Sequence, residues 1–350
     1  MGRTPMLLDN TPRLLVRSPN PLGDACMSLP AVRAMKRSGF DPSITVLCRE
    51  NLLPLWEIQP EVDAVIAFPK GISPRAVGRI IRERNKRLFD AAVLLPHSLR
   101  SALEVRSAGI KNLIGYRGHW RSLLLKQLIT DPETSAENQH HVHRYLHIAR
   151  EIGADISDLD ALLKIPPPPS PIPTNREDSI HLGICPGAEY GNAKRYPIER
   201  YAAAVKILKK SRPETPIRVS VFGSPAERVI AEELATLLGE PVTNRAGETS
   251  IAGLVDELRS CHFLATNDTG TMHLAAALGV PTVAIFGSTE PDFTSPIGGG
   301  VHRIIRHKVD CSPCFLRECP IDYRCMLRIE PDLVAREMTS LLGNGDSSPR

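Results

Sequence analysis

The residues best suited to chemistry lie where a predicted buried strand gives way to a helix. Residues 266–273, Thr-Asn-Asp-Thr-Gly-Thr-Met-His, follow a strand and open a helix. Small residues let the backbone approach a ligand, and the first free N–H groups and the helix dipole favour negative charge. A nucleotide pyrophosphate suits such a site. The alternative is that Asn267 or Asp268 only caps the helix and His273 packs within it.

Two further turns of this kind lie in the C-terminal half. Residues 186–197 form a Gly-rich turn after a strand, and it carries Lys194 just before a helix. Lys194 could meet a diphosphate, although a lone lysine at a helix start is usually only solvated. Residues 222–227 form the third turn, in which Glu227 could accept hydrogen bonds from ribose hydroxyls. Equally, Glu227 could be an N-terminal carboxylate that the helix dipole favours.

Four cysteines near the C-terminus form a separate pattern. Cys311, Cys314, Cys319 and Cys325 lie within fifteen residues. In a reduced compartment this spacing is compatible with a structural metal, above all zinc, although it is not that of two paired knuckles. An iron–sulfur cluster, or simple reduced thiols in a loop, are the alternatives.

The elements that must position these residues alternate between strand and helix. Short apolar runs at residues 13–18, 44–48, 64–68, 91–95, 181–185, 218–222, 262–266 and 282–286 are separated by helical patterns. This alternation predicts parallel α/β sheets. The proline-rich stretch 166–173 can join neither a helix nor a central strand. We therefore expect domains at 1–168 and 169–330, followed by a C-terminal helix and tail at 331–350.

Composition excludes several classes of protein. Of the 350 residues, 42% are hydrophobic and 23% charged, which is ordinary for a globular chain. No run of eighteen apolar residues and no secretory leader is found, so we expect a cytoplasmic protein. Neither early loop matches Gly-x-Gly-x-x-Gly, so a nicotinamide or flavin enzyme loses its main support.

Positive charge is concentrated in the first half. Residues 70–126 hold 13 Lys and Arg but only 3 Asp and Glu, although the net charge of the chain is +4. The excess indicates a surface for phosphate or carboxylate groups, or else a solvated helix face over residues 75–87. Downstream, His143 and His147 stand four residues apart near Arg144, a spacing compatible with a metal but more common on an amphipathic helix.

Together these residues resemble glycosyltransferase family 9, the bacterial heptosyltransferases of lipopolysaccharide synthesis. The resemblance spans nearly the whole chain. It is carried by the loop ending at Asp24, by residues 95–101 and 115–118, and most specifically by residues 185–197 and 267–273. It implies the type B glycosyltransferase fold, two Rossmann-like domains facing across a cleft, with the acceptor bound by the first and ADP-heptose by the second.

The resemblance also implies roles for residues at matched positions. Asp24 would be the general base, and Lys194 the cation on the departing diphosphate. The donor would be bound by Glu227, Asp268, Thr269, Gly270 and His273. Displacing ADP from an anomeric carbon needs donors for the growing negative charge and a base for the acceptor hydroxyl, which fits this assignment. From the residues alone, Asp24 could equally be the N-cap of a helix starting at Ala25.

The acceptor is expected on the basic surface of the first domain, where the candidates are Arg100, Arg117, Arg121 and Arg144. The resemblance implies an inverting transfer of heptose to the first heptose of the lipopolysaccharide inner core, on a heptosyl-Kdo-lipid A type acceptor. Catalysis would need no cofactor. The same basic surface could hold the enzyme at the inner face of the inner membrane by electrostatic contact.

Two alternatives stay open. The chain could be heptosyltransferase I or III, or another family 9 enzyme with a different acceptor. From another class, it could be a zinc-dependent nucleic-acid-binding protein that uses the cysteines and the basic surface. An aromatic content of 5% offers no stacking platform for that second function, so no nucleic acid is expected.

Overall fold

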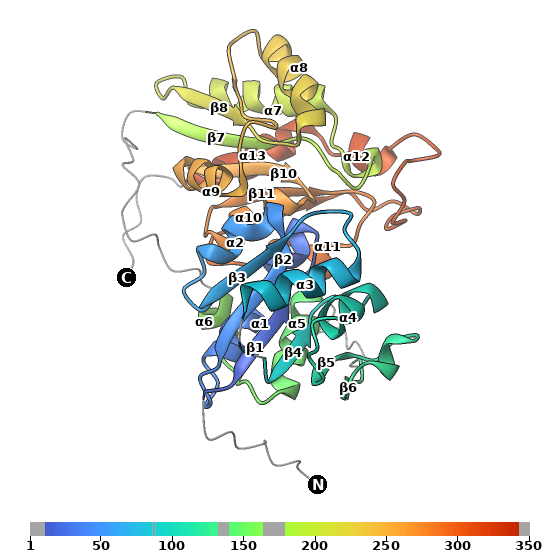
Figure 1. Cartoon of the computed structure of the whole chain (residues 1–350). Coiled ribbons are helices and arrows are strands. Elements are labelled where there is room, and N and C mark those ends of the chain that lie inside the picture. The colour runs from blue at the N-terminus through green and yellow to red at the C-terminus, as the bar shows by residue number, and fades with distance from the viewer. Residues whose placement is uncertain (1–10, 86, 88, 132–139, 164–178, 343–350) are drawn as a thin grey trace. The chain divides into compact units, whose positions relative to one another are not determined.

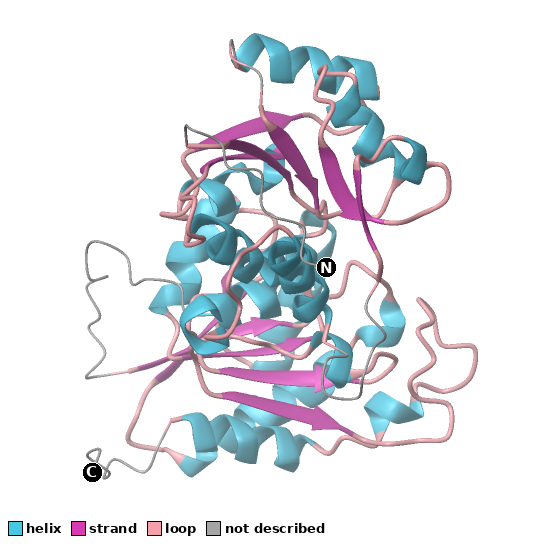
Figure 2. Ribbon diagram, turned by 90° about the horizontal axis from the view of Figure 1, so that it is seen from below, coloured by secondary structure: helices cyan, strands magenta, loops and turns pink. Residues whose placement is uncertain are grey.

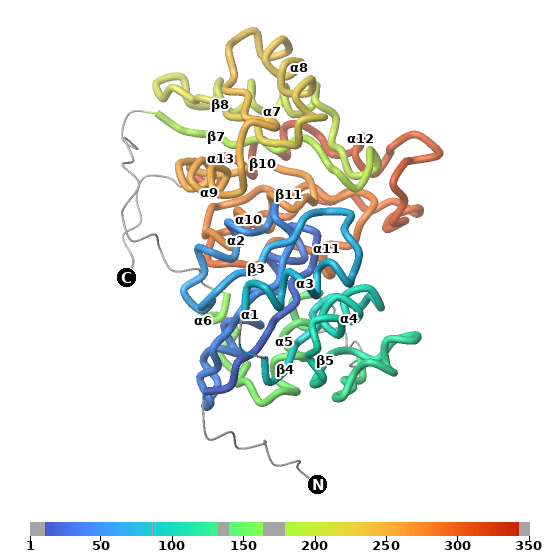
Figure 3. Tube along the Cα trace, viewed as in Figure 1, coloured from blue at the N-terminus to red at the C-terminus, as the bar shows by residue number. Residues whose placement is uncertain are grey.

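The computed structural model describes residues 11–85, 87, 89–131, 140–163 and 179–342. The chain divides into two compact units, Met1–Leu163 and Lys164–Arg350. Figure 3 follows the chain through the first unit in blue to green and through the second in yellow-green to red. The expected boundary after residue 168, the proline-rich stretch 166–173 and the tail 343–350 lie outside the described residues.

The first unit is built on a parallel sheet of six strands in the order β3-β2-β1-β4-β5-β6 (Figure 1). Its strands are β1 (Arg13–Arg17), β2 (Ser43–Arg49), β3 (Ala64–Phe68), β4 (Ala91–Leu94), β5 (Leu113–Tyr116) and β6 (Gln127–Ile129). The central strand β1 is almost entirely buried, as expected of a parallel strand that is covered on both faces.

Helices cover both faces of this sheet, as Figure 2 shows. One group consists of α1 (Leu22–Lys36), α5 (His141–Glu151) and α6 (Leu159–Leu163), and the other of α3 (Pro74–Arg84) and α4 (Leu99–Arg106). Between β2 and β3 the chain forms the short helices η1 (Glu50–Leu52) and α2 (Leu53–Glu57). Leu15 of β1 packs with Val77 and Val105 under α3 and α4. Because successive strand residues point to opposite faces, β1 contributes to both cores.

The second unit repeats the design. Its parallel strands are β7 (Ile180–Cys185), β8 (Ile217–Val221), β9 (Thr243–Asn244), β10 (Phe263–Asn267), β11 (Thr282–Phe286) and β12 (His302–Arg306). Their order is β12-β11-β10-β7-β8-β9. Read from the β9 edge, this is the order 3-2-1-4-5-6 that the first unit also has, which is the order of a Rossmann fold.

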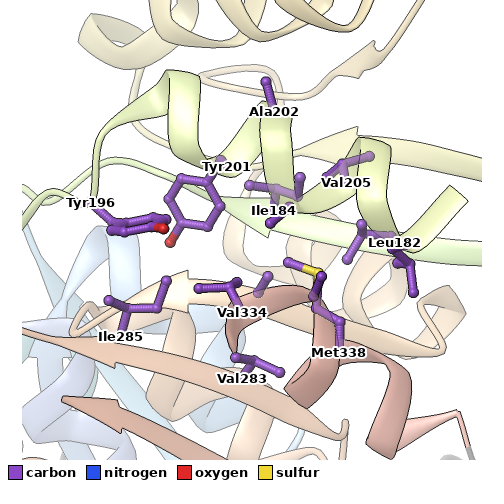
Figure 4. Close-up of a cluster of buried hydrophobic side chains, with 14 of the residues drawn as sticks. Leu182, Ile184, Tyr196, Tyr201, Ala202, Val205, Val283, Ile285, Val334 and Met338 are labelled. Carbon is purple, nitrogen blue, oxygen red and sulfur yellow. The ribbon is translucent and has the colours of Figure 1, made fainter. Parts of the chain in front are cut away.

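The core of the second unit shows how the sequence pattern produces its layers. On one face lie α7 (Ile198–Ser211), α8 (Arg228–Leu238) and α13 (Pro331–Leu341), and α9 (Ile251–Ser260) packs with α10 (Gly270–Ala277). In Figure 4, Val283 and Ile285 of β11 lie in one cluster with Val334 of α13. The alternate residues Ala284 and Phe286 pack instead with Met272 of α10. The smaller helices are α11 (Pro291–Thr294) and α12 (Arg324–Leu327).

This topology decides where a ligand can bind in each unit. The first strand of each sheet, β1 or β7, pairs with the second strand on one side and with the fourth on the other. At such a switch point the connections leave in opposite directions, so a crevice opens beyond the carboxyl ends of the strands. We therefore expect ligand-binding and catalytic residues in the loops after β1 and β4 of the first unit and after β7 and β10 of the second.

The predicted α/β class with two Rossmann-like domains is confirmed. The expected strands at 64–68 and 282–286 have the predicted bounds, but β5, β6, β9 and β12 were not predicted. The helix expected from Ala25 starts instead at Leu22, because Pro21 adopts an extended conformation and serves as its N-cap. In the described part of the chain, no helix is long and apolar enough to cross a membrane.

Candidate active site

The clearest polar centre of the second unit is an ion pair between Lys194 and Asp268. Lys194 ends the short helix η4 (Asn192–Lys194) after β7, and Asp268 directly follows β10. The Lys194 Nζ lies 2.6 Å from Asp268 Oδ2, with the two side chains 14% and 4% exposed. The same carboxylate oxygen accepts a 2.7 Å hydrogen bond from Thr289 Oγ1. The carboxylate therefore fixes the ammonium group, which still has other N–H bonds for a ligand.

The first turn of α10 lies beside this pair. Thr269 is the N-cap, and its Oγ1 accepts a hydrogen bond from Met272 N at 3.3 Å. The alternative that Asn267 or Asp268 caps this helix is wrong. Gly270 is partly exposed, so an anion can reach the N–H groups at the helix start, which have no partner within the helix. His273 is in the next turn and is buried.

Asn267 was proposed only as a cap, but it joins the loop after β7 to the end of β10. Its Nδ2 donates to the carbonyl oxygens of Pro186 (2.7 Å) and Gly187 (3.2 Å), and its Oδ1 accepts from Tyr196 N (3.1 Å). Asn267 is fully buried. It therefore holds the Gly-rich turn after β7 against the end of β10, which are the two segments that carry Lys194 and Asp268.

Glu227 is a carboxylate at the start of a helix, as one of its two interpretations expected. It ends η5 (Pro225–Glu227) in a capping box, where its Oε2 accepts from Ser224 N at 2.8 Å and from Ser224 Oγ at 3.0 Å. Its Oε1 is buried and accepts no hydrogen bond, and the Arg195 guanidinium is 3.6 Å away. A buried carboxylate oxygen without a hydrogen bond is costly. It is thus a ready acceptor for a ligand hydroxyl.

Gly187 is placed against this carboxylate. A Cβ built on Gly187 would lie 1.9 Å from Glu227 Oε1, so no other residue fits here without moving the glutamate. Position 187 of this turn is therefore a glycine because the backbone packs closely against the Glu227 carboxylate.

In the first unit, Asp24 lies in the first turn of α1 and is partly exposed. Because α1 starts at Leu22, Asp24 is inside the helix, and its interpretation as an N-cap is wrong. A carboxylate in a first turn is favoured by the helix dipole. The Tyr145 hydroxyl of α5 donates to Asp24 Oδ1 at 3.3 Å. The sequence interpretation missed Tyr145, whose only signal was its place next to Arg144.

The Tyr145 phenol holds its proton firmly. Burial raises its pKa well above the usual value, and the neighbouring Asp24 charge raises it further. Tyr145 therefore acts as a hydrogen-bond donor to the carboxylate and not as a competing base. Its hydrogen bond holds one oxygen of the Asp24 carboxylate in place.

A stack of aromatic and basic side chains lies beyond β4 and β5. We call it the Tyr116 stack, consisting of His97, Tyr116, Arg144 and His147. The rings of His97 and Tyr116 are 4.8 Å apart, and those of Tyr116 and His147 are 5.8 Å apart. The Arg144 guanidinium lies 5.9 Å from the Tyr116 ring and pairs with Asp131 at 2.6 Å. His147 Nδ1 is 2.9 Å from the Tyr116 hydroxyl.

These contacts explain the histidines of α5. His140 is the N-cap of the helix, and its ring accepts a hydrogen bond from Val142 N. His147 belongs to the Tyr116 stack. Among the residues that the structure describes, no three His, Cys, Asp or Glu side chains are grouped to hold a metal ion. His143 and His147 both lie on the amphipathic helix α5.

The four candidate acceptor arginines differ in exposure. Arg117 is exposed, and the Arg100 side chain is 46% exposed while paired with Glu104 at 3.1 Å. Arg121 is only 1% exposed and donates through Nη1 to the Pro96 carbonyl at 2.7 Å. Its expected place on the basic surface is therefore wrong. The space that Gly115 leaves open, with no Cβ, admits the guanidinium. Burial lowers the Arg121 pKa to about 10, so the group stays charged at neutral pH.

The four C-terminal cysteines are free thiols. Burial raises the pKa of Cys325, and the nearby Cys311, Cys319 and Cys314 raise it further. The Cys319 Sγ accepts a hydrogen bond from Tyr323 N at 3.3 Å. The thiols are thus neighbours. In the described residues, however, no three of them are arranged as a group that could hold a metal ion. Zinc at this cluster stays a prediction.

Known proteins are similar to this chain over most of its length. The model of glycosyltransferase family 9 (heptosyltransferase) matches residues 77–324. Lipopolysaccharide heptosyltransferase 2 of Escherichia coli K12 is 30% identical, over 94% of this chain and 98% of its own length. Lipooligosaccharide heptosyltransferase 2 of Haemophilus ducreyi is 28% identical, over 94% and 99%.

Solved structures give the same picture. The structure of E. coli ADP-heptose lps heptosyltransferase II has a TM-score of 0.73 and 29% identity, and the match covers 94% of this chain and 98% of that one. A family 9 glycosyl transferase from Veillonella parvula has a TM-score of 0.77 at 18% identity, over 95% and 97% of the two chains, and supports the fold alone.

Proposed function

The chain belongs to glycosyltransferase family 9, the heptosyltransferase family, and is a glycosyltransferase; from this premise we propose that it transfers heptose from ADP-heptose to the first heptose of the lipopolysaccharide inner core. Relatives named heptosyltransferase 2 match nearly the whole chain, which favours this acceptor over those of heptosyltransferase I or III. The single observation that carries the donor half is the Lys194–Asp268 pair beside the start of α10.

The donor diphosphate binds at the N-terminus of α10 and meets the Lys194 ammonium group. Thr269 and Gly270 line the helix start, where the backbone dipoles favour the anion. Lys194 takes the charge that grows on the leaving ADP, while Asp268 and Thr289 hold its ammonium group in place. Donors placed in advance stabilise the transition state without reorganising during the reaction.

The ribose binds at Glu227. Its Oε1 is the buried acceptor without a hydrogen bond, and a ribose hydroxyl supplies the missing donor. The capping box with Ser224 keeps the carboxylate fixed while it binds the sugar. His273 is buried, so it supports the sugar site from within α10.

Asp24 supplies the other half of the reaction. The acceptor hydroxyl oxygen attacks the anomeric carbon from the face opposite ADP, and its proton passes to the Asp24 carboxylate. The bond between the anomeric carbon and the β-phosphate oxygen breaks with its electrons leaving on ADP, so the configuration inverts. Tyr145 is a positioning residue, since its hydrogen bond orients the carboxylate. No cofactor is required in this scheme.

The acceptor binds to the first unit through its cations. Arg100, Arg117 and Arg144 are the groups that meet its carboxylates and phosphates, and the buried Arg121 adds positive potential behind them. Because this acceptor is a heptosyl-Kdo-lipid A type molecule, the enzyme works at the inner face of the inner membrane, held there by electrostatic contact. A zinc-dependent nucleic-acid-binding function has no feature of the described site in its favour.

Purified protein, ADP-heptose and lipopolysaccharides of defined length test this function. We expect ADP release and a product one heptose heavier only with the acceptor that ends at its first heptose. Transfer to an acceptor that ends at Kdo would instead indicate the reaction of heptosyltransferase I. No transfer to any of the acceptors would refute the proposed function.

Metal analysis of the same preparation tests the zinc prediction separately. A structural metal predicts about one zinc per chain that is lost in Cys319→Ser, with transfer surviving brief treatment with a chelator. Metal-free protein with full activity would show that the four cysteines are simple thiols.

A further inference from the structure

The turn between β5 and β6 exposes large apolar side chains that a folded protein normally covers. Trp120 is 71% exposed and Leu123 81% exposed, and Leu128 of the edge strand β6 is 41% exposed. We call Trp120, Leu123 and Leu128 the apolar tip. Trp120 is the N-cap of the 3₁₀ turn η2 (Arg121–Leu123), and Leu123 is its last residue.

This exposure does not come from a loose loop. The Ser122 hydroxyl accepts from Gly118 N at 3.1 Å and donates to Gly118 O at 2.9 Å, which closes the turn. Arg121 is anchored inside the unit, and Leu125 packs in its core. The same segment thus buries Arg121 and Leu125 while it holds Trp120 and Leu123 outward.

The backbone at Trp120 supports the same interpretation. Trp120 has φ +58° and ψ −34°, a positive φ that bulky side chains rarely adopt. Such a conformation costs free energy and persists only where the surrounding structure imposes it, often at a functional site. Here the unfavourable backbone conformation belongs to a tryptophan whose side chain is mostly exposed.

The charge around the apolar tip is one-sided. Residues 117–130 contain Arg117, Arg121 and Lys126 and no Asp or Glu. Arg117 and Lys126 are exposed. An apolar tip flanked by cations complements a surface that is anionic outside and apolar beneath, which is the chemistry of a lipid bilayer with acidic headgroups. Tryptophan is also the side chain most typical of the membrane interface.

We propose that the apolar tip docks on an anionic lipid bilayer. Trp120 and Leu123 enter the headgroup region, and Arg117 and Lys126 contact lipid phosphates. This inference rests on the proposed function only in that a lipid-linked acceptor requires the enzyme to reach a membrane. The three apolar side chains of the tip are also a small surface for a stable protein interface, which needs about 800 Å² per partner.

Binding to vesicles tests the docking directly. We expect the full chain to cosediment with vesicles of phosphatidylethanolamine and phosphatidylglycerol and much less with phosphatidylcholine alone. Trp120→Ser and Leu123→Ser should each weaken binding about tenfold, since each removes apolar burial. Lys126→Gln should weaken it about fivefold at low salt. Val229→Ser, at a site 69% exposed in the second unit, is the matched control and should bind normally.

Tryptophan fluorescence gives a second readout, because the chain has two tryptophans. Trp56 is fully buried and donates to Ser18 Oγ, so a vesicle-dependent change should come from Trp120. We expect a blue shift and quenching by brominated lipids, both lost in Trp120→Phe. An unchanged spectrum on adding anionic vesicles, or equal binding of Trp120→Ser, would overturn the docking.

Assays of activity and of self-association distinguish bilayer docking from contact with the acceptor glycan and from a protein interface. Trp120→Ser should lose transfer to acceptor embedded in vesicles and keep transfer to a deacylated, water-soluble acceptor. An equal loss on both would mean that Trp120 contacts the acceptor glycan and not the bilayer. If the wild type self-associates without lipid and Trp120→Ser does not, the tip is a protein interface. Vesicle binding can be read even if no acceptor is used, so a failed heptose transfer leaves this test intact.

Discussion

Replacing Lys194 by methionine removes the ammonium group but keeps most of the length of the side chain. In the folded protein it leaves the Asp268 carboxylate, 4% exposed, without its 2.6 Å partner. Breaking a fully buried pair costs about 3–5 kcal/mol. The cost should lie towards or below the low end of that range, because the Lys194 side chain is 14% exposed and the Thr289 hydroxyl still donates to Asp268 at 2.7 Å. We therefore expect the free energy of unfolding to fall by about 2–4 kcal/mol.

The same change should weaken donor binding. A hydrogen bond from a charged group to a diphosphate contributes about 1.5–3 kcal/mol, which corresponds to a roughly 10- to 150-fold rise in the Kd for ADP. Turnover should fall as well, because the ammonium group also faces the charge that develops on the leaving ADP.

Urea unfolding, calorimetry with ADP and a transfer assay measure these three effects. Lys209→Met is the matched control, because Lys209 pairs with Glu240 at the surface of the same unit. It should cost at most about 1 kcal/mol and leave ADP binding unchanged. In the double variant Lys194→Met with Asp268→Asn, roughly half of the lost stability should return, since the buried charge is gone. Wild-type ADP affinity and turnover in Lys194→Met would remove Lys194 from the donor site.

Three further outcomes are expected. Asp24→Asn should retain ADP affinity by calorimetry and lose about 10²- to 10⁴-fold in turnover, and normal turnover would exclude it as the base. Gly187→Ala should displace Glu227, whose Oε1 would lie 1.9 Å from the new Cβ, and so weaken ADP binding. Gly253→Ala is the control, because the nearest atom to a Cβ at this position is 3.7 Å away, and this variant should bind ADP normally. Equal ADP affinities of the two variants would contradict the ribose contact. Burial lowers the pKa of His181 in the folded protein to about 4. As the pH falls, this imidazole is therefore protonated in the unfolded chain before it is protonated in the folded protein. Stability should therefore be full above about pH 6.5 and decline by on the order of 3 kcal/mol towards pH 4, a decline that urea titrations should find smaller in His181→Gln.

Much of the fold was predictable because its signals are local. A parallel strand covered on both faces is a short apolar run, such as residues 282–286, and strands that alternate with helices predict a Rossmann-like sheet. Strands β6 and β12 lie at sheet edges and are partly exposed, so their sequences lack a continuous apolar run. The start of α1 was missed by three residues because Asp24 resembles a cap.

The polar residues at the strand ends of the second unit were also largely visible in the sequence. A small-residue turn between a strand and a helix identified Asp268, and similar turns identified Lys194 and Glu227. Each of these signals lies within about twelve residues of chain, because strand, turn and helix start follow one another directly. The sequence could not decide which residue caps α10, since Asn267, Asp268 and Thr269 are all good capping residues.

The amino-acid sequence by itself determined the two α/β units and the turns that carry the polar residues. Only the tertiary structure decided their partners. Tyr145 bonds to Asp24, 121 residues away in the sequence, and Lys194 bonds to Asp268, 74 residues away. It also buried Arg121 and exposed Trp120 one residue before it. Periodicity and turn chemistry act between near neighbours, whereas these contacts depend on the order of strands in the sheet and on which helices pack together.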